Sequence, residues 1–288
     1  MIYENKGFPE MNYLLYNTKA DGGHGEESAK KALSVLKGDY EAKASNDIDL
    51  ASFFSTLGKE DKVVILGGDG TINYFINHVD IDNLPCPIFL YPSGTGNDFA
   101  KDVVSPNEDG LIPLNGYFAN LPYAEIKGKT YRFINGIGYG IDGQCCEVAD
   151  QKTAKGEPVD YAKITVGLLF HGYKPRKATV TVDGVTSTYK RVYLASGMHG
   201  RYYGGGMMIA PEQNRNSGLL SCVVVHNRGK LGTLMLFPKL FSGTHVKAKK
   251  SVAIITGKEI QVNFDTPCAL QVDGETILGV SEYRVYFR

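Results

Sequence analysis

Two different patterns along the chain predict an α/β domain with a parallel sheet and flanking helices, followed by an antiparallel β-sandwich. In the first part, short apolar runs alternate with stretches of helical spacing, which is typical of parallel strands covered by helices. After about Tyr123, β-branched and aromatic residues alternate in short runs separated by Gly-containing turns, which is typical of a sandwich. We therefore expect residues 1–123 and 124–288 to form two domains, a number that the length of 288 residues also favours.

The first domain is expected to contain strands and helices in turn. Strands are predicted at residues 13–16, 63–66 and 88–91, and helices at residues 26–36, 50–57 and 72–79. The carboxyl ends of parallel strands lie at one edge of a sheet, and ligands bind there. The loops that follow these strands are therefore expected to carry function.

The second domain is expected to consist mainly of short strands. They are predicted at residues 131–134, 178–182, 189–195, 219–225, 252–255, 259–264 and 283–287. Hairpin turns are predicted at Asp183-Gly184 and Asp273-Gly274, because Asp-Gly favours a two-residue turn. Two stretches, residues 161–170 and 231–241, have the spacing of amphipathic helices.

Composition favours a cytoplasmic protein. The 31 Lys and Arg balance 31 Asp and Glu, so no overall field draws the chain to nucleic acid or to an anionic membrane. The five cysteines lack Cys-x-x-Cys spacing, which favours reduced thiols. The first nine residues do not resemble a signal peptide. No apolar run approaches the roughly 18 residues needed to span a bilayer.

A glycine-rich loop, Gly-Gly-Asp-Gly-Thr at residues 67–71, directly follows the strand predicted at 63–66. Such a loop lets backbone N–H groups approach a phosphate, and the start of the next helix favours negative charge. Thr71 can cap that helix, and Asp69 can hold Mg²⁺ or position a nucleotide. A plain tight turn also fits these residues, and the spacing is neither that of the Walker loop nor that of the dinucleotide fingerprint.

A second polar loop, Pro-Ser-Gly-Thr-Gly-Asn-Asp-Phe-Ala at residues 92–100, follows the strand predicted at 88–91. It supplies two glycines, two hydroxyls, an amide and a carboxylate. These groups suit a polar ligand that lies across adjacent strand ends. Two such loops after neighbouring strands predict a binding site at this edge of the sheet.

The two loops together resemble the catalytic domain of the diacylglycerol kinase family, which is shared with sphingosine, ceramide and bacterial lipid kinases. The first loop alone also fits NAD kinases and phosphofructokinases, whereas the second favours the lipid branch. The resemblance covers nearly the whole chain, through residues 17–23, 133–142, 204–211 and, most diagnostically, Val-Asp-Gly-Glu at 272–275. It implies an α/β nucleotide-binding domain followed by a β-sandwich lipid-binding domain.

The resemblance implies an ATP- and Mg²⁺-dependent kinase of phospholipid metabolism that phosphorylates a lipid hydroxyl, with diacylglycerol as the default acceptor. Glu275 matches the catalytic base, with Asp273 beside it, although a carboxylate next to a Gly turn is usually just part of a hairpin. Asp69 would organise Mg²⁺ and the phosphates. The nucleotide-binding residues that the resemblance implies are Asn17, Ser45, Gly67, Gly68, Asp69, Gly70, Thr71, Asn73, Ser93, Thr95 and Asn97.

Several positions depart from the family, among them Thr18, which stands in place of a proline in the loop after the first strand. Bacterial relatives often carry an acidic ligand for a structural Mg²⁺ where this chain has Ser217. A hydroxyl lacks the charge that a hard cation needs, so no structural metal is expected there. Glu125 stands where the family tends to have Asp, in the strand that enters the second domain.

Several alternatives stay open. The chain could instead phosphorylate a soluble acceptor such as NAD, or act as a non-catalytic nucleotide or lipid sensor. A lipid substrate would require transient peripheral contact with a membrane, and a homodimer is compatible with the sequence. Arg201 could clamp a phosphate. Residues 231–241 and their flanking lysines fit either lipid docking or core packing beside a solvated basic strand.

Overall fold

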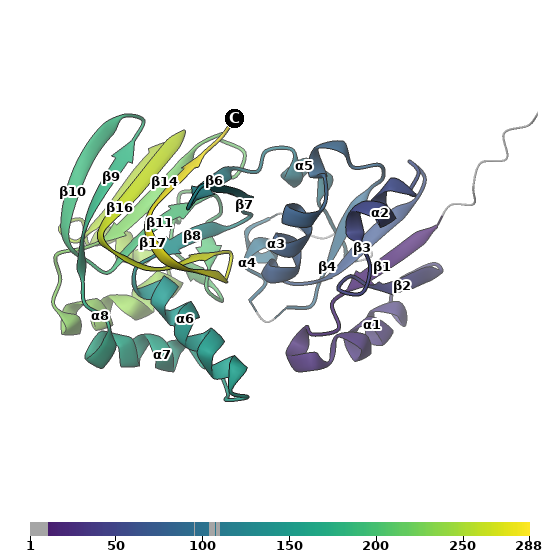
Figure 1. Ribbon diagram of the computed structural model, residues 1–288, viewed down its shortest axis with the longest axis horizontal. Coiled ribbons are helices and arrows are strands. Elements are labelled where there is room, and N and C mark those ends of the chain that lie inside the picture. The colour runs from purple at the N-terminus through teal and green to yellow at the C-terminus, as the bar shows by residue number, and fades with distance from the viewer. Residues whose placement is uncertain (1–10, 95, 104–106, 108–109) are drawn as a thin grey trace, which may run out of the picture. The chain divides into compact units, whose positions relative to one another are not determined.

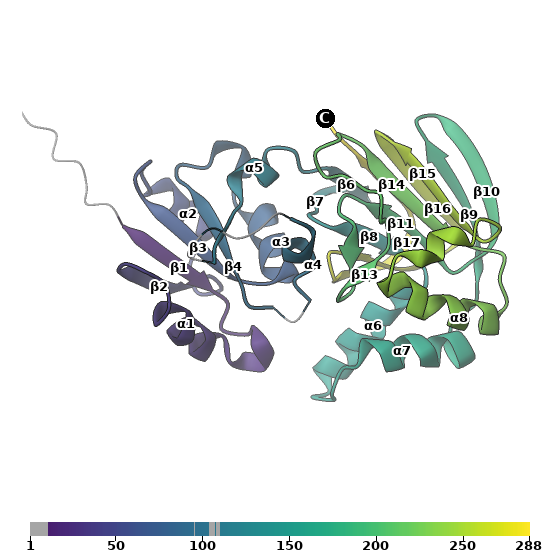
Figure 2. The same cartoon turned by 180° about the vertical axis from the view of Figure 1, so that it is seen from behind.

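The computed structural model describes residues 11–94, 96–103, 107 and 110–288 of the chain. These residues form two compact units, drawn in Figure 1 and from behind in Figure 2. The first unit takes in residues 11–94, 107 and 110–119, and the second takes in residues 96–103 and 120–288. Residues 96–103, which carry the later part of the second polar loop, thus belong to the second unit.

The first unit is built on a five-stranded sheet in the order β2 (Tyr40–Ala44), β1 (Asn12–Tyr16), β3 (Lys62–Gly67), β4 (Ile88–Pro92) and β5 (Ile112–Pro113). The first four strands run parallel, and β5 pairs antiparallel with β4. The three strands predicted in this part are confirmed. β2 was not predicted, because Tyr-Glu-Ala-Lys-Ala contains no apolar run. As an edge strand it is only partly buried, so polar residues are tolerated there.

Helices cover both faces of this sheet (Figure 1). On one face, α1 (Gly25–Leu33) packs Ala29 and Ala32 into a cluster with Leu14 and Val64 of the strands. On the other face, aromatic rings join α2 (Leu50–Ser55), α3 (Asp69–His78) and α5 (Asn115–Phe118) through Phe54, Phe75 and Phe118. Short 3₁₀ turns precede α1 (η1, Asp21–Gly23) and follow α3 (η2, Ile81–Asn83). The sheet is therefore a rigid platform whose strand ends carry the loops.

The expectation that Thr71 caps α3 is wrong. The helix begins at Asp69, its N-cap is Gly68, and no side chain bonds the cap. Thr71 instead lies within the first turn, where its backbone N–H donates to the carbonyl of Gly68. The start of α3 is thus formed by backbone alone.

The second unit contains a ten-stranded antiparallel sheet. Its main path runs β15 (Val252–Gly257), β14 (Leu220–Val225), β11 (Leu194–Met198), β8 (Gly136–Tyr139), β16 (Glu259–Val272), β17 (Glu275–Tyr286), β6 (Tyr123–Ile126) and β7 (Lys129–Arg132). β9 (Arg176–Val182) pairs with β16 and with β10 (Val185–Val192). β16 pairs with β9 along its first half and with β8 along its last three residues. One face of the sheet encloses an apolar core that includes Phe133, Tyr139 and Tyr283.

Three helices pack on the opposite face of this sheet, as Figures 1 and 2 show. They are α6 (Ile141–Ala154), α7 (Tyr161–Gly167), which continues into a π-helical turn, η3 (Leu168–Gly172), and α8 (Lys230–Phe241). The helices predicted at 161–170 and 231–241 are confirmed. α6 was missed, because its buried residues Gly143, Cys145 and Ala149 are small and give only a weak helical pattern.

Smaller elements complete the second unit. They are α4 (Asp98–Asp102), the two-stranded ribbon of β12 (Tyr202–Tyr203) with β13 (Met207–Met208), and η4 (Thr244–Lys247). All five cysteines are free. No helix within the described residues has both the length and the apolar character that a bilayer span requires.

Candidate functional site

A polar pocket lies in the first unit at the carboxyl ends of β1, β3 and β4. Four of the predicted nucleotide-binding residues line it, namely Asn17, Gly67, Gly68 and Ser93. Ser45 and Thr71 line a small separate recess with residues of α2 and α3. The structure therefore gathers the residues of the first loop and of the loop after β1 at one edge of the sheet, where the sequence predicted them.

Two glycines in this pocket are required by close packing. A Cβ on Gly67 would lie 2.1 Å from the hydroxyl oxygen of Thr71, and a Cβ on Gly25 would lie 1.9 Å from the carbonyl oxygen of Asn17. Gly70 differs, since a Cβ there would meet nothing within 4 Å among the described residues. Packing among the described residues therefore does not require a glycine at position 70, and the open space leaves room for a ligand to approach this backbone.

Two helices begin at the pocket. α1 starts at Gly25 and α3 starts immediately after Gly68, and neither N-cap residue makes a side-chain capping hydrogen bond. The first backbone N–H groups of a helix carry partial positive charge and bind an anion favourably. The pocket thus offers two helix starts to a negatively charged group.

The loop after β1 is tied to the loop after β2. Thr18, which stands where the related family has proline, donates its backbone N–H to the side-chain oxygen of Asn46 at 3.0 Å. The amide oxygen of Asn17 accepts from the N–H of Lys19 at 2.9 Å. The buried Ser45 hydroxyl donates to the carbonyl of Tyr16 at 3.0 Å. Ser45 therefore holds β1 and β2 together, a role that the sequence did not reveal.

The other residues predicted to bind nucleotide do not all lie at this pocket. Asn73 is buried within α3 and does not line the pocket. Ser93 donates its N–H to the carbonyl of Gly67 at 3.0 Å, which joins the two polar loops. Thr95 lies outside the described residues. Asn97, in the second unit, begins α4 in the left-handed conformation (φ 49°), and its buried amide oxygen has no hydrogen-bond partner within the described part of the chain.

Metal ligands are sparse. Among the described residues, no group of three or more His, Cys, Asp or Glu side chains could hold a metal ion. Magnesium that arrives with a nucleotide needs only one or two carboxylates, since phosphates supply further ligands. Asp69, the first residue of α3, is the carboxylate that follows the pocket residues Gly67 and Gly68 in the chain. The Ser217 hydroxyl donates to the carbonyl of Asn214 at 2.7 Å, and the absence of a structural metal there stays a prediction.

The hairpin between β16 and β17 carries the two predicted catalytic carboxylates of the second unit. Val272 pairs with Glu275, and the turn residues Asp273 and Gly274 have φ of 47° and 99°, which confirms the predicted two-residue turn. The Asp273 carboxylate accepts the backbone N–H groups of Ile134, Asn135 and Gly136 at 2.6, 2.8 and 3.0 Å. Glu275 is exposed at the start of β17. Asp273 is thus held by backbone amides, whereas Glu275 is open to solvent.

A side-chain network that sequence reasoning missed supports this hairpin. The Gly274 N–H donates to the side-chain oxygen of Gln271 at 2.8 Å, and Gln271 in turn bonds Asp142 of α6. Asp142 also accepts the hydroxyl of Tyr203 at 2.9 Å. Burial raises the pKa of Asp142 to about 6, against these hydrogen bonds, which lower it. The one signal in the sequence was Gly138, because a Cβ there would collide with the Asp142 carboxylate.

The negative charge of Glu275 affects the pKa of side chains in α6 and α7. Burial raises the pKa of the Tyr161 hydroxyl to about 12, and the negative charge of Glu275 contributes to that shift. Burial likewise raises the pKa of the Cys146 thiol, with smaller contributions from Asp142 and Glu275. The negative charge of Glu275 thus acts on groups of α6 and α7, and β17, which Glu275 begins, contacts α6.

A buried ion cluster lies behind the hairpin, within the second unit. Asp102 of α4 binds the guanidinium groups of Arg201 and Arg215, each through Nε at 2.5 Å. Arg215 also donates to the carbonyl of Ile134 and, at 2.6 Å, to the side chain of Asn135. Since Asp273 bonds the N–H groups of these same two residues, the cluster fixes the segment that holds the hairpin.

Two residues considered at the start have structural roles. The Arg201 guanidinium is engaged by Asp102, so the idea that Arg201 clamps a phosphate is not supported. The Glu125 carboxylate accepts the Arg284 guanidinium and the Tyr286 hydroxyl at 3.1 and 2.8 Å, and the Tyr286 hydrogen bond lowers the pKa of Glu125. Glu125 thus joins β6 to β17.

The chain thus combines an α/β unit that has a polar pocket at its parallel strand ends with an antiparallel unit that presents an Asp-Gly-Glu hairpin. Comparison with known families agrees. Residues 12–115 match the diacylglycerol kinase catalytic domain, and residues 135–283 match the YegS C-terminal NAD kinase beta sandwich-like domain. The chain belongs to this family of kinases.

Individual relatives are distant. A protein of Bacillus subtilis (strain 168) named "Putative lipid kinase YtlR" is 25% identical over 79% of this chain and 77% of its own length. The diacylglycerol kinase of the same organism is 23% identical over 91% of this chain and 88% of its own. The crystal structure of "a putative diacylglycerol kinase" from Bacillus anthracis str. Sterne has a TM-score of 0.68 at 18% identity, covering 100% of this chain and 96% of that one. The last comparison shows a shared fold.

Proposed function

We propose that this protein transfers the γ-phosphoryl group of ATP to the hydroxyl of a lipid such as a diacylglycerol. It would thus be a phosphotransferase with an alcohol group as acceptor. The Asp-Gly-Glu hairpin carries the proposal. Because Asp273 is pinned by three backbone amides, Glu275 is the carboxylate of this turn that remains exposed to meet an acceptor. The names of the relatives support a lipid as that acceptor.

The nucleotide would bind at the strand ends of the first unit. Phosphates suit the backbone of Gly67 and Gly68 and the starts of α1 and α3, and Gly70 leaves open space for their approach. Mg²⁺ bound with ATP would neutralise charge on the transferring phosphates, and Asp69 is the carboxylate that would hold it. Phosphoryl transfer needs such positioning and charge neutralisation more than covalent chemistry from the protein.

Glu275 would act as the general base. As the acceptor oxygen forms its bond to the γ-phosphorus and the bond to the β-γ bridging oxygen breaks, the hydroxyl proton would pass to the Glu275 carboxylate. The products are a phosphorylated lipid and ADP. Asp273 would not touch the reacting atoms. It would keep the turn in the left-handed conformation that presents Glu275.

Phosphorylation of a lipid panel tests the proposal. Radiolabelled ATP and Mg²⁺ would be supplied with mixed lipids in detergent micelles to the wild type, Glu275→Gln and Asp273→Asn. We expect a labelled lipid that falls by about 10² to 10⁴ in Glu275→Gln, the usual contribution of a general base, with ATP binding and stability unchanged. Asp273→Asn should lose turnover together with about 1–3 kcal/mol of stability, because an amide cannot satisfy all three N–H donors.

Other outcomes would contradict the proposal. ATP binding without any turnover would indicate a sensor, and label on a soluble acceptor such as NAD would indicate the other class of kinase. A Glu275→Gln variant that retains wild-type turnover would remove Glu275 from the role of base.

A further inference from the structure

The balanced net charge hides a strong asymmetry along the chain. Residues 161–288 contain 17 Lys and Arg against seven Asp and Glu, so the remaining 160 residues carry the compensating acidic excess. Within this basic part, residues 161–182 and 213–258 contain no Asp or Glu at all. Those two segments include α7, η3, α8 and η4, which belong to one unit and pack on the same face of its sheet. An acidic first part of the chain followed by a basic second part indicates a charged binding partner.

α8 carries an apolar stripe that faces solvent. Leu231 and Met235 are 66% and 59% exposed, and Phe241 at the end of the helix is 46% exposed. At 100° per residue, Leu231, Met235 and the exposed Pro238 fall within about 60° of one another. The buried residues Thr233 and Leu236 lie on the opposite side. Packing therefore explains one side of the helix and leaves the apolar stripe without a partner in the described chain.

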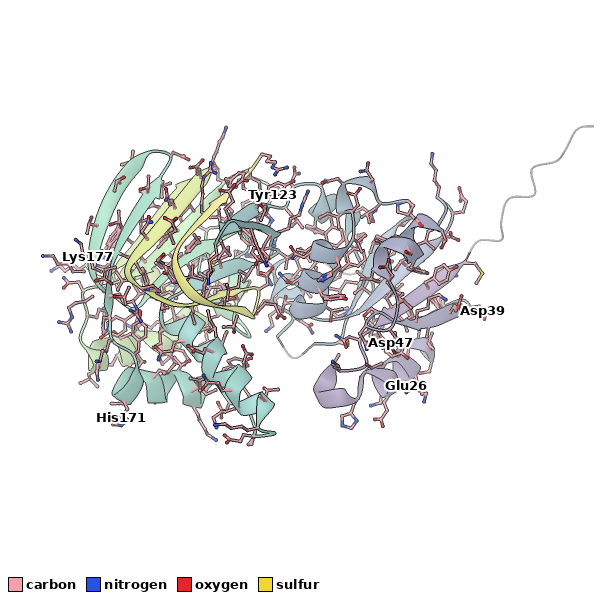
Figure 3. All side chains as sticks on the ribbon, viewed as in Figure 1. Glu26, Asp39, Asp47, Tyr123, His171 and Lys177 are labelled. Carbon is pink, nitrogen blue, oxygen red and sulfur yellow. The ribbon has the colours of Figure 1, made fainter. Side chains whose placement is uncertain are left out.

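Basic side chains border the stripe. On the helical wheel, Lys239 lies on one side of it and Lys230 on the other. The Lys230 ammonium donates to the carbonyl of Phe170 at 2.8 Å, which brings the exposed ring of Phe170 in η3 next to the start of α8. His171, the neighbour of Phe170, extends into solvent (Figure 3). We call Phe170, Leu231, Met235, Phe241 and Lys239 the α8 face.

We propose that the α8 face docks on the surface of an anionic lipid bilayer, with its apolar side chains in the headgroup region and the lysines beside it on the lipid phosphates. Large apolar side chains flanked by Lys, with no acidic residue in the segment, are the features of an interfacial helix. A protein partner would also bury the stripe, but the run of 46 residues without Asp or Glu specifically complements a uniformly negative surface. The inference rests on the proposed function for the reason to visit a membrane.

Vesicle sedimentation without ATP tests this proposal separately from turnover. The full chain would be spun with vesicles of phosphatidylcholine alone and of phosphatidylcholine mixed with phosphatidylglycerol, at low and high salt. We expect binding to the mixed vesicles that weakens with salt. The apolar double variant Leu231→Ser with Met235→Ser should bind about tenfold less tightly. In the charge variant, the exposed Lys239, Lys247 and Lys250 all become Glu. Its affinity for the mixed vesicles should fall by at least about tenfold as well.

A matched control replaces two equally exposed apolar residues outside the face. Val185 and Val35 are 72% and 63% exposed, so Val185→Ser with Val35→Ser should leave vesicle binding unchanged. Phosphorylation of lipid in detergent micelles should be unaffected by all of these variants. That assay reports the proposed function independently. Absence of kinase activity together with intact vesicle binding would contradict the proposed function and would still support the docking surface.

Three results would overturn the docking proposal. The first is no sedimentation with the anionic vesicles at low salt, and the second is equal loss of binding in the control and in the α8 variants. The third is a concentration-dependent dimer of the wild type, measured by ultracentrifugation, that the Leu231 and Met235 substitutions abolish while vesicle binding stays unchanged. This last result would assign the α8 face to a second copy of the chain.

Discussion

The glycine loop at residues 67–71 and the Asp273-Gly274 turn are built in opposite ways. The loop at residues 67–71 starts α3 without a side-chain cap, and the Thr71 side chain, which leaves no room for a Cβ at Gly67, belongs to the loop itself. The turn at Asp273-Gly274 is held by side chains and amides from distant parts of the chain, with Ile134 and Asn135 nearly 140 residues away. A site made of backbone can be recognised from a short motif. A site made by a network depends on partners that no short motif contains.

We expect the largest loss of stability from a substitution that breaks the side-chain network of the second unit. Arg215→Met removes a buried guanidinium that binds Asp102, the carbonyl of Ile134 and the side chain of Asn135. Loss of one partner from a buried ion cluster costs about 3–5 kcal/mol of stability, because the remaining groups stay buried and unpaired. Urea unfolding measures this loss. ATP binding to the pocket of the first unit, measured by calorimetry under native conditions, should be unchanged.

Arg201→Ala is the matched control for Arg215. Its guanidinium binds the same carboxylate of Asp102, but its side chain is 37% exposed against 7% for Arg215. Water screens and replaces the interaction of Arg201, so we expect a loss of about 1 kcal/mol or less. Equal losses in the two variants would show that burial does not decide the strength of this cluster.

A second prediction concerns the pH dependence of the network. The pKa of Asp142 is raised to about 6 by burial, above the ordinary value near 3.9. The protonated side chain is therefore favoured by folding. The contribution of Asp142 to the free energy of unfolding is complete below about pH 4 and is lost as the pH rises through 6. Asp142→Asn removes the ionisation, so we expect this variant to be more stable than the wild type by roughly 3 kcal/mol at pH 7 and similar at pH 4.

The difference between the two urea midpoints, followed from pH 4 to pH 7, isolates Asp142. Other groups that titrate in this range, such as His226, are common to both proteins and cancel. The amide of Asn still offers an oxygen to the Tyr203 hydroxyl, so the packing of the network is kept. Parallel curves for the two proteins would contradict a raised pKa at Asp142.

These contrasts show which features of the molecule can be predicted from its sequence. The parallel strands and the pocket residues Asn17, Gly67 and Ser93 could be predicted, because each follows an apolar strand and the strand ends must meet. The hairpin could be predicted as well, since Asp-Gly dictates its turn. β2 and α6 could not, because an edge strand and a helix with small buried residues leave weak patterns.

The roles of side chains were the least predictable part. His199 follows β11 and is buried beside Phe133, and burial lowers its pKa, none of which its place in the chain indicates. Ser45 was predicted at the nucleotide site, and its bond from β2 to β1 was not. Arg215 carried no signal, because its partner Asp102 lies 113 residues away. What a residue does in this molecule follows from the strand or helix that folding brings against it, and the chain order does not record that neighbour.

The smallest effect on stability gives the sharpest test of the backbone-built pocket. Gly70→Ala places a methyl group in open space within the first turn of α3, so helix propensity should raise stability by about 0.5–1 kcal/mol. Gly67→Ala is the contrast, because its methyl would collide with Thr71 and cost about 1–3 kcal/mol. If nucleotide phosphates approach the loop, ATP binding should fall about tenfold in Gly70→Ala although the protein is more stable. Unchanged ATP affinity in the stabilised variant would mean that the nucleotide does not lie over Gly70.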